Sequence, residues 1–291
     1  MTFHGRHIGT MLATVARKSI DDNLLGWAAE TAYNFFFGIF PAVLFAAPLL
    51  ALFADPNTVL SWVLTRASES LPPDAALLVE RVVKDILTTS NAPGLISAGV
   101  VLSLWAGSSM FSSLMSALNA AYEVKETRPW WKQKLIAMAC TIGGVFAVWC
   151  ATIIMLAGQQ IVDAAVRFLG LSAAGAVIWA IVQYLLALAL VVAFLWTIYV
   201  VLPNVHKQHK QTVIAGGLFA TLFWLLFTYA FRMYVEHFGS YNKTYGTIGA
   251  VIVLLTWMYW TMFAILVGGE VNAELQRAKD GGPPPTPRGG A

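Results

Sequence analysis

Charged residues are scarce in this 291-residue chain, and that scarcity excludes most soluble folds. Asp, Glu, Lys and Arg make up 11% of the sequence, whereas 58% is hydrophobic and the mean hydropathy is +0.68. A soluble globular domain carries about 25% charged residues. We therefore expect a protein that resides in a membrane.

The chain also lacks the residue patterns of catalysis. It contains no P-loop, no dinucleotide-binding glycine motif and no metalloprotease helix motif. Its two cysteines, Cys140 and Cys150, share one apolar run; on a helix they would stand about 15 Å apart, too far for a disulfide. The five histidines are dispersed along the chain. We expect no enzyme activity, no metal and no cofactor.

Six apolar stretches each have the length of a membrane crossing. About 20 mostly apolar residues span a hydrocarbon core of about 30 Å, and backbone groups in lipid must be paired, so each stretch should be helical. The stretches are 27–54, 95–122, 135–158, 176–202, 212–235 and 247–270. We predict an all-α polytopic membrane fold with six transmembrane helices. Pro41 and Pro48 predict a tilt or kink in the first.

The segments around the predicted helices divide the chain into three parts. Residues 1–26 form a cytoplasmic amphipathic segment, either at the membrane interface or packed on the loops of the bundle. Residues 27–275 form the transmembrane domain, with a small helical periplasmic cap at 55–93. The proline-rich tail 276–291 should be disordered. Tyr241–Gly246, aromatic at both sides and ending in Gly, is expected to form a short hairpin between the fifth and sixth helices.

Lys and Arg residues set the orientation. With the N-terminus in the cytoplasm, twelve of the 18 lie in inside segments and six in outside segments, as the positive-inside rule requires. Both termini are then cytoplasmic. The net charge of +3 therefore reflects topology and contact with anionic headgroups, and it does not indicate nucleic acid as a partner.

Polar residues inside the apolar stretches are the candidate functional residues, because a central charge costs about 2.5–3.5 kcal/mol on insertion scales. Glu30 and Asn34 lie one turn apart on the first helix, and Glu270 follows two glycines at the end of the sixth. Both carboxylates should lie near the cytoplasmic side. They either share a polar pocket or reach interfacial water.

Two further patterns concern helix packing. The second helix carries Ser108, Ser112, Ser116 and Asn119 on one face, where small residues favour close helix contacts over a polar path. Gly216, Gly217 and Ala220 on the fifth helix have the same packing role. Arg232, near the outer end of that helix, could bind a lipid phosphate or pair with Glu236.

Several of these stretches resemble the YihY/virulence factor BrkB family of bacterial inner-membrane proteins, once labelled ribonuclease BN. The matching residues run in the same order over about 250 positions: Ala28-Ala29 to Ala32-Tyr33, Phe40-Pro41, Leu104-Trp105 to Leu118-Asn119, Tyr122, Arg128-Pro129, Leu202-Pro203-Asn204, Tyr241-Asn242, Tyr245-Gly246 and Gly269-Glu270-Val271-Asn272. Glu30 departs from the family pattern, which usually has an apolar or small residue there. The resemblance implies six transmembrane helices and an inner-membrane location. It also implies movement of envelope lipids or of lipopolysaccharide precursors.

Our leading hypothesis is a polar cleft between the first, second, fifth and sixth helices that takes the headgroup of an anionic envelope lipid, a phospholipid or a lipopolysaccharide precursor. Arg128 and Arg232 would bind phosphate, since a guanidinium forms bidentate contacts with it. The candidate residues are Glu30, Asn34, Ser112, Ser116, Asn119, Arg128, Arg232, Asn242, Tyr245, Glu270 and Asn272. The alternative is a non-transporting anchor for an envelope assembly complex, and a ribonuclease is less favoured. Membrane lipids are the expected partners; a periplasmic envelope protein and a homo-oligomer stay open.

Overall fold

The computed structural model describes residues 2–3, 6–53, 92–169, 173–205, 208–238 and 241–280. The described helices are α1 (Ile8–Asp21), α2 (Leu24–Phe53), α5 (Ala92–Ala121), α6 (Trp130–Leu169), α7 (Ala173–Val201), α8 (Lys210–Phe238) and α9 (Tyr241–Lys279). Two short strands, β1 (Thr2–Phe3) and β2 (Arg6–His7), pair antiparallel before α1. The expected cap at 55–93 lies outside the described residues, apart from 92 and 93 at the start of α5. Of the tail expected to be disordered at 276–291, residues 276–279 are helical in α9, and residues 281–291 lie outside the described part.

The six long helices coincide with the six apolar stretches, so the helices predicted from hydropathy are confirmed. Pro41 and Pro48 lie within α2, which is one continuous helix. Among the described residues, three stretches are long and apolar enough to cross a membrane: Ile181–Val201, Thr212–Val235 and Val251–Lys279. A helix that is apolar around most of its circumference is typical of a lipid environment or of the core of a large protein.

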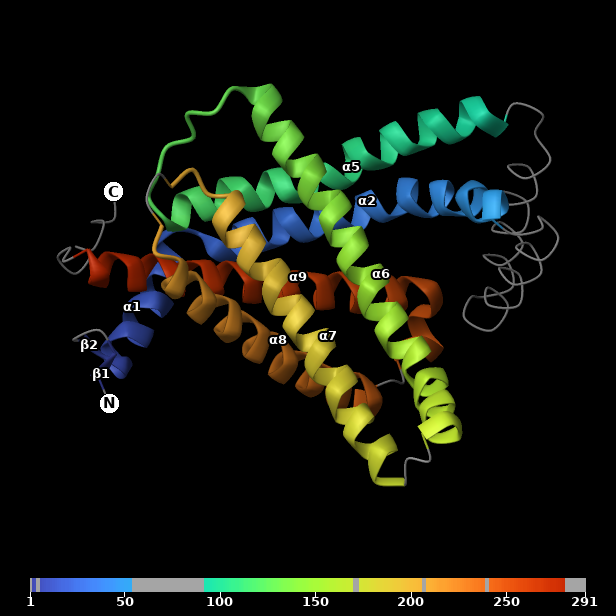
Figure 1. Ribbon diagram of the computed structural model, residues 1–291. Coiled ribbons are helices and arrows are strands. Elements are labelled where there is room, and N and C mark those ends of the chain that lie inside the picture. The colour runs from blue at the N-terminus through green and yellow to red at the C-terminus, as the bar shows by residue number, and fades with distance from the viewer. Residues whose placement is uncertain are drawn as a thin grey trace.

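The long helices pack in a closed ring that follows their order in the sequence. α2 packs against α5, α5 against α6, α6 against α7, α7 against α8 and α8 against α9, and α9 then closes the ring against α2. In Figure 1, α2, α5 and α9 run nearly together while α6 and α7 cross in front of them. From α5 onward, short connections between consecutive helices favour this arrangement. α1 lies at the end of the bundle where α9 ends (Figure 1).

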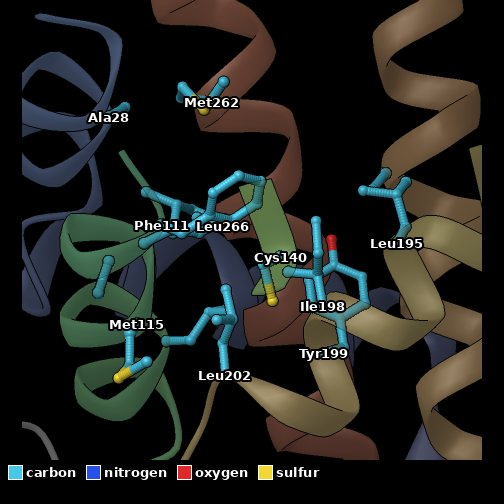
Figure 2. Packing of buried hydrophobic residues seen from close by; sticks show 14 of the residues in the cluster. Ala28, Phe111, Met115, Cys140, Leu195, Ile198, Tyr199, Leu202, Met262 and Leu266 are labelled. Atoms are coloured by element: carbon cyan, nitrogen blue, oxygen red, sulfur yellow. The ribbon is translucent and has the colours of Figure 1, made fainter. Parts of the chain in front are cut away.

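The interior of the ring at this end is a dense apolar core. Figure 2 shows Phe111 of α5 beside Leu266 of α9, with Met115 and Leu202 below them and Met262 above. Tyr199 is fully buried, and its hydroxyl donates a 2.6 Å hydrogen bond to the carbonyl of Ile265. A buried hydroxyl needs such a partner, because an unpaired one costs about 1–3 kcal/mol.

Glycines allow two pairs of helices to approach closely. A Cβ on Gly216 of α8 would lie 2.2 Å from the carbonyl oxygen of Gly268 on α9, and a Cβ on Gly38 of α2 would lie 3.2 Å from the Cα of Gly107 on α5. Ala220, one turn beyond Gly216, is also buried. The packing role predicted for Gly216 and Ala220 is confirmed.

The hairpin expected at Tyr241–Gly246 is wrong. These residues are helical and form the first turns of α9, which begins at Tyr241. An aromatic pair with Asn and Gly suggests a turn in water. In a helix that enters a membrane, however, intrahelical bonds are the only means of pairing the backbone groups, and this requirement outweighs the local turn preference.

Candidate functional site

Helix α1 is docked on the last turns of α9 by a small apolar contact. Val15 is buried with Val267, Val271 and Leu275 of α9, and Met11 packs against the same cluster. The amphipathic face predicted for this segment is therefore packed on the bundle. This contact places Lys18, which lies on the polar side of α1, close to the last turns of α9.

Lys18 is the centre of an ionic cluster, which we define as Lys18, Glu123, Glu270, Glu274 and Arg277. Lys18, Glu270 and Glu274 are buried, Arg277 is half-buried, and Glu123 is exposed at the edge of the cluster. The Lys18 ammonium lies 2.6 Å from a carboxylate oxygen of Glu123, 3.6 Å from one of Glu274 and 3.9 Å from one of Glu270. Arg277 pairs with Glu274 and lies 3.3 Å from Glu123. The side chains of Glu270, Glu274 and Lys18 are 0%, 1% and 6% exposed. Buried charges need such pairing, because an isolated one is very costly.

The backbone places Glu123 in the cluster. Glu123, two residues beyond the end of α5, has a φ of 54°, in the left-handed region. The N–H of Glu123 bonds to the carbonyl of Ala120, and the N–H of Val124 to that of Asn119. This is a Schellman cap, in which the left-handed position is usually Gly. A non-Gly residue there costs about 1 kcal/mol or more, and here its carboxylate reaches both cations of the cluster.

Three polar groups, one within the cluster and two beside it, make no hydrogen bond with the described residues. They are both carboxylate oxygens of Glu270, the side-chain N–H2 of Asn272 and the hydroxyl of Tyr122. The other end of the Asn272 amide accepts a 2.8 Å hydrogen bond from the backbone N–H of Gly216. Tyr122 lies close enough to Glu270 and Asn272 to interact electrostatically with both. Unpaired buried groups of this kind are uncommon in native proteins.

Arg128, in the loop between α5 and α6, holds this loop against the residues that follow α7. Its guanidinium donates to both carboxylate oxygens of Glu126, at 2.8 and 2.7 Å, and to the carbonyls of Val201 and Leu202 at 3.2 and 2.5 Å. Asn119 donates to Glu126 at 2.9 Å and accepts from the backbone N–H of Asn204 at 2.7 Å. Arg128 and Asn119, expected at a lipid headgroup, are thus used to join two loops.

The ionised form of the Glu126 carboxyl is stabilised by these contacts. Hydrogen bonds from Arg128 lower the pKa of the Glu126 carboxyl from 4.5 to about 2, and the bond from Asn119 acts in the same direction. Charge-assisted bonds of this bidentate kind are among the strongest in proteins. We refer to Asn119, Glu126, Arg128 and Asn204 as the loop latch.

Glu30 and Asn34 of α2 meet α5 through a serine that the sequence pattern did not single out. Ser113 donates a 2.9 Å hydrogen bond to Glu30, and Asn34 donates a 2.6 Å bond to the Ser113 hydroxyl. Glu30 is exposed on the bundle surface, whereas Ser113 is buried. Tyr33 and Phe37, 59% and 50% exposed, lie on the same helix. We call Glu30, Asn34 and Ser113 the polar stripe.

The other predicted serines do not bond to a neighbouring helix. Ser112 and Ser116 donate to the carbonyls of Ser108 and Ser112 in their own helix, at 3.0 and 3.2 Å. Hydroxyls commonly bond back to the preceding turn in helices. Ser108, which donates to Trp105, is fully buried, as a packing role requires.

The structure places the remaining predicted residues at different points of the bundle. Glu30 and Glu270 have different partners, Ser113 and Lys18. Arg232 is exposed on α8. Asn242 and Tyr245 lie in the first turns of α9, and their side chains are outside the described part of the structure. Five of the predicted residues thus lie in three separate polar groups: the ionic cluster, the loop latch and the polar stripe.

Sequence reasoning missed Lys18, Glu123, Glu126 and Glu274. A signal was present in the i, i+4 and i+3 spacing of Glu270, Glu274 and Arg277, which places the three side chains on one helix face. No comparable signal links Lys18 or Glu123 to them, because they are distant in sequence. Within the described ranges, no group of three or more His, Cys, Asp or Glu residues is arranged to hold a metal ion.

The fold and these sites define a helical membrane protein with an ionic cluster where α1 meets α9. The chain belongs to the virulence factor BrkB family, whose model matches residues 15–289. It is 32% identical over 253 residues to the putative ribonuclease-like protein YfkH of Bacillus subtilis, covering 87% of this chain and 90% of that protein.

Matches to proteins named UPF0761 membrane protein agree with this assignment. The one from Tolumonas auensis is 25% identical and covers 65% of this chain and 60% of that protein. The one from Klebsiella pneumoniae is 35% identical over 83 residues, 28% of this chain and 29% of that protein. No solved structure matches the chain.

Proposed function

We propose that this protein crosses a bacterial inner membrane six times, through α2 and α5 to α9, with both termini in the cytoplasm. Within that membrane it would hold or translocate envelope lipids without enzymatic chemistry. The closed ring of six long helices supports the crossing number. The docking of α1 on the end of α9 supports termini on one side. The excess of Lys and Arg in the predicted inside segments supports the orientation.

The observation that carries the lipid proposal is the polar stripe on the surface of α2 and α5. Asn34 lies ten residues, or about 15 Å, from the start of α2, and Glu30 one turn nearer to it. An exposed carboxylate at membrane depth is costly when it faces hydrocarbon alone. A lipid headgroup beside the stripe would supply polar partners, while its acyl chains stay in the bilayer.

Exposed cations and indole rings at the start of α6 favour an anionic headgroup. Lys125 and Lys132 are exposed on either side of Trp130 and Trp131, which are 66% and 59% exposed. Indole rings prefer the membrane interface. Each Lys near an anionic membrane surface contributes about 1 kcal/mol of attraction. This region would concentrate anionic lipids at the side where the stripe begins.

A lipid-translocation assay tests the proposal. The protein would be placed in liposomes containing fluorescent phosphatidylglycerol, and the rate at which the label reaches the other leaflet would be measured. Asn34→Leu removes one stripe hydrogen bond, worth about 1 kcal/mol, and should slow movement about fivefold. The matched control is Thr197→Val on α7, an exposed position whose hydroxyl donates to the carbonyl of Ala193 in its own helix, and it should leave the rate unchanged.

Two outcomes would overturn lipid translocation. If the intact, correctly inserted protein moves no label, the non-transporting anchor becomes the better account. If Asn34→Leu and Thr197→Val move the label equally fast, the stripe is not the path. The printed name of the Bacillus relative belongs to that protein; cleavage of tRNA by pure protein with added divalent metal would argue for such an activity here.

A further inference from the structure

Glu270 is the least compensated charged group among the described residues of the ionic cluster. It is completely buried, and neither of its carboxylate oxygens accepts a hydrogen bond. The nearest cation, the Lys18 ammonium, is 3.9 Å away and already lies 2.6 Å from Glu123. A buried carboxylate is stable when several donors hold it. Here the donors are directed to other residues.

The charge balance of the cluster points to the same residue. Two cations, Lys18 and Arg277, face the three carboxylates Glu123, Glu270 and Glu274. Asp22, beside α1, adds a further negative field at Glu270, and the Tyr122 hydroxyl lies on the α5 side. Of these carboxylates, Glu270 is the fully buried one whose two oxygens both accept no hydrogen bond from the described residues. A bound proton would neutralise it.

The occupant must also fit into a packed site. A Cβ on the neighbouring Gly269 would lie 2.4 Å from Leu118, and one on Gly268 would lie 2.5 Å from the Tyr199 hydroxyl. No metal-holding group of residues lies in the described part of the chain. A proton is the cation that needs no added volume and no set of ligands.

We propose that Glu270 is a proton-binding site through which this protein uses a proton gradient. The inference rests on the proposed function for its role in lipid movement, but not for the existence of the site. A proton from water binds one carboxylate oxygen of Glu270 and gives the neutral acid, and on release it returns to water. Deprotonation leaves a carboxylate that attracts Lys18 and so tightens the docking of α1 on α9. When Glu270 is protonated, Lys18 keeps only its ion pairs with Glu123 and Glu274.

Infrared spectroscopy of the purified, membrane-reconstituted protein tests the site directly. The C=O band of a protonated carboxyl should be present at neutral pH, disappear in Glu270→Gln and persist in Glu30→Gln, the matched control at an exposed carboxylate. Lys18→Met removes the nearest cation, and the band should then persist to higher pH than in the intact protein. The proposal is overturned if the intact protein shows no such band at any pH where it stays folded. It is also overturned if the band survives Glu270→Gln, or if Lys18→Met leaves its pH dependence unchanged.

Lipid movement with and without an imposed pH gradient tests the coupling. The intact protein should respond to the gradient, and Glu270→Gln should not. A protonated-carboxyl band without any lipid movement would refute the proposed function and leave the proton site standing. Lipid movement that is equally fast with and without the gradient would refute the coupling.

Discussion

Substitution of Gly216 tests the close contact between α8 and α9. An alanine Cβ at this position would lie 2.2 Å from both the Gly268 carbonyl oxygen and the amide oxygen of Asn272. Ordinary contact begins near 3.4 Å, so the helices would have to separate by about 1.2 Å. One of these neighbours is backbone, which cannot turn away as a flexible side chain can.

Two effects contribute to the expected loss of stability in Gly216→Ala. Overpacking a closely packed interface costs about 1–3 kcal/mol. Separation would also lengthen the 2.8 Å bond from the Gly216 N–H to Asn272, a loss of about 1 kcal/mol. We therefore expect Gly216→Ala to destabilise the protein by about 2–4 kcal/mol.

Gly217→Ala is the matched control, because the atom nearest to the added Cβ would be the carbonyl oxygen of Val192, 3.9 Å away. There the substitution should be neutral, or stabilising by up to about 1 kcal/mol through helix propensity. Unfolding of both variants by denaturant in the same detergent gives the comparison. If Gly216→Ala is as stable as Gly217→Ala, the helix contact described above is incorrect.

The remaining predictions concern the loop latch and the cap of α5. Arg128→Ala should cost about 2–4 kcal/mol at pH 6, because it leaves Glu126 without its main partner; Arg128→Lys should recover only part, since Lys cannot form the bidentate contact. Because Arg128 holds the pKa of Glu126 at about 2 instead of 4.5, this stabilisation is complete above pH 4.5 and is lost as the pH falls toward 2. The stability difference between the intact protein and Arg128→Ala, measured by thermal unfolding, should shrink over that range; a constant difference would contradict the assignment. Glu123→Gln should lose the ion pairs with Lys18 and Arg277 but keep the left-handed strain, whereas Glu123→Gly should be more stable than Glu123→Gln by about 1 kcal/mol. Equal thermal stability of these two variants would show that the left-handed position of Glu123 carries no cost.

The helices were readable from the sequence because hydrophobic length is a local property. Each apolar stretch coincides with one long helix, and backbone pairing in lipid leaves few alternatives. The helix boundaries were less readable. The Tyr241–Gly246 turn signal was outweighed by helix continuity, because a turn preference acts over a few residues while the helix is stabilised over its full length.

The functional residues were only partly readable. Glu30, Asn34 and Glu270 stood out because polar groups in apolar stretches are rare. Their partners did not stand out: Ser113 is one of many serines on α5, and Lys18 was indistinguishable from other basic residues near the N-terminus. Asn119 and Arg128 carried a strong pattern, but their roles in the loop latch depend on Glu126 and Asn204.

The sequence by itself determined that this chain forms long apolar helices, and it determined which of their residues are polar. Only the tertiary structure decided which polar residues meet. Gly216 and Gly217 are adjacent and chemically identical, yet only Gly216 lies against the backbone of α9. Likewise, Lys18 and Glu270 are about 250 residues apart, and the docking of α1 brings them within 3.9 Å. Periodicity fixes the face on which a side chain lies, whereas ring closure and the rotation of each helix fix what that face contacts.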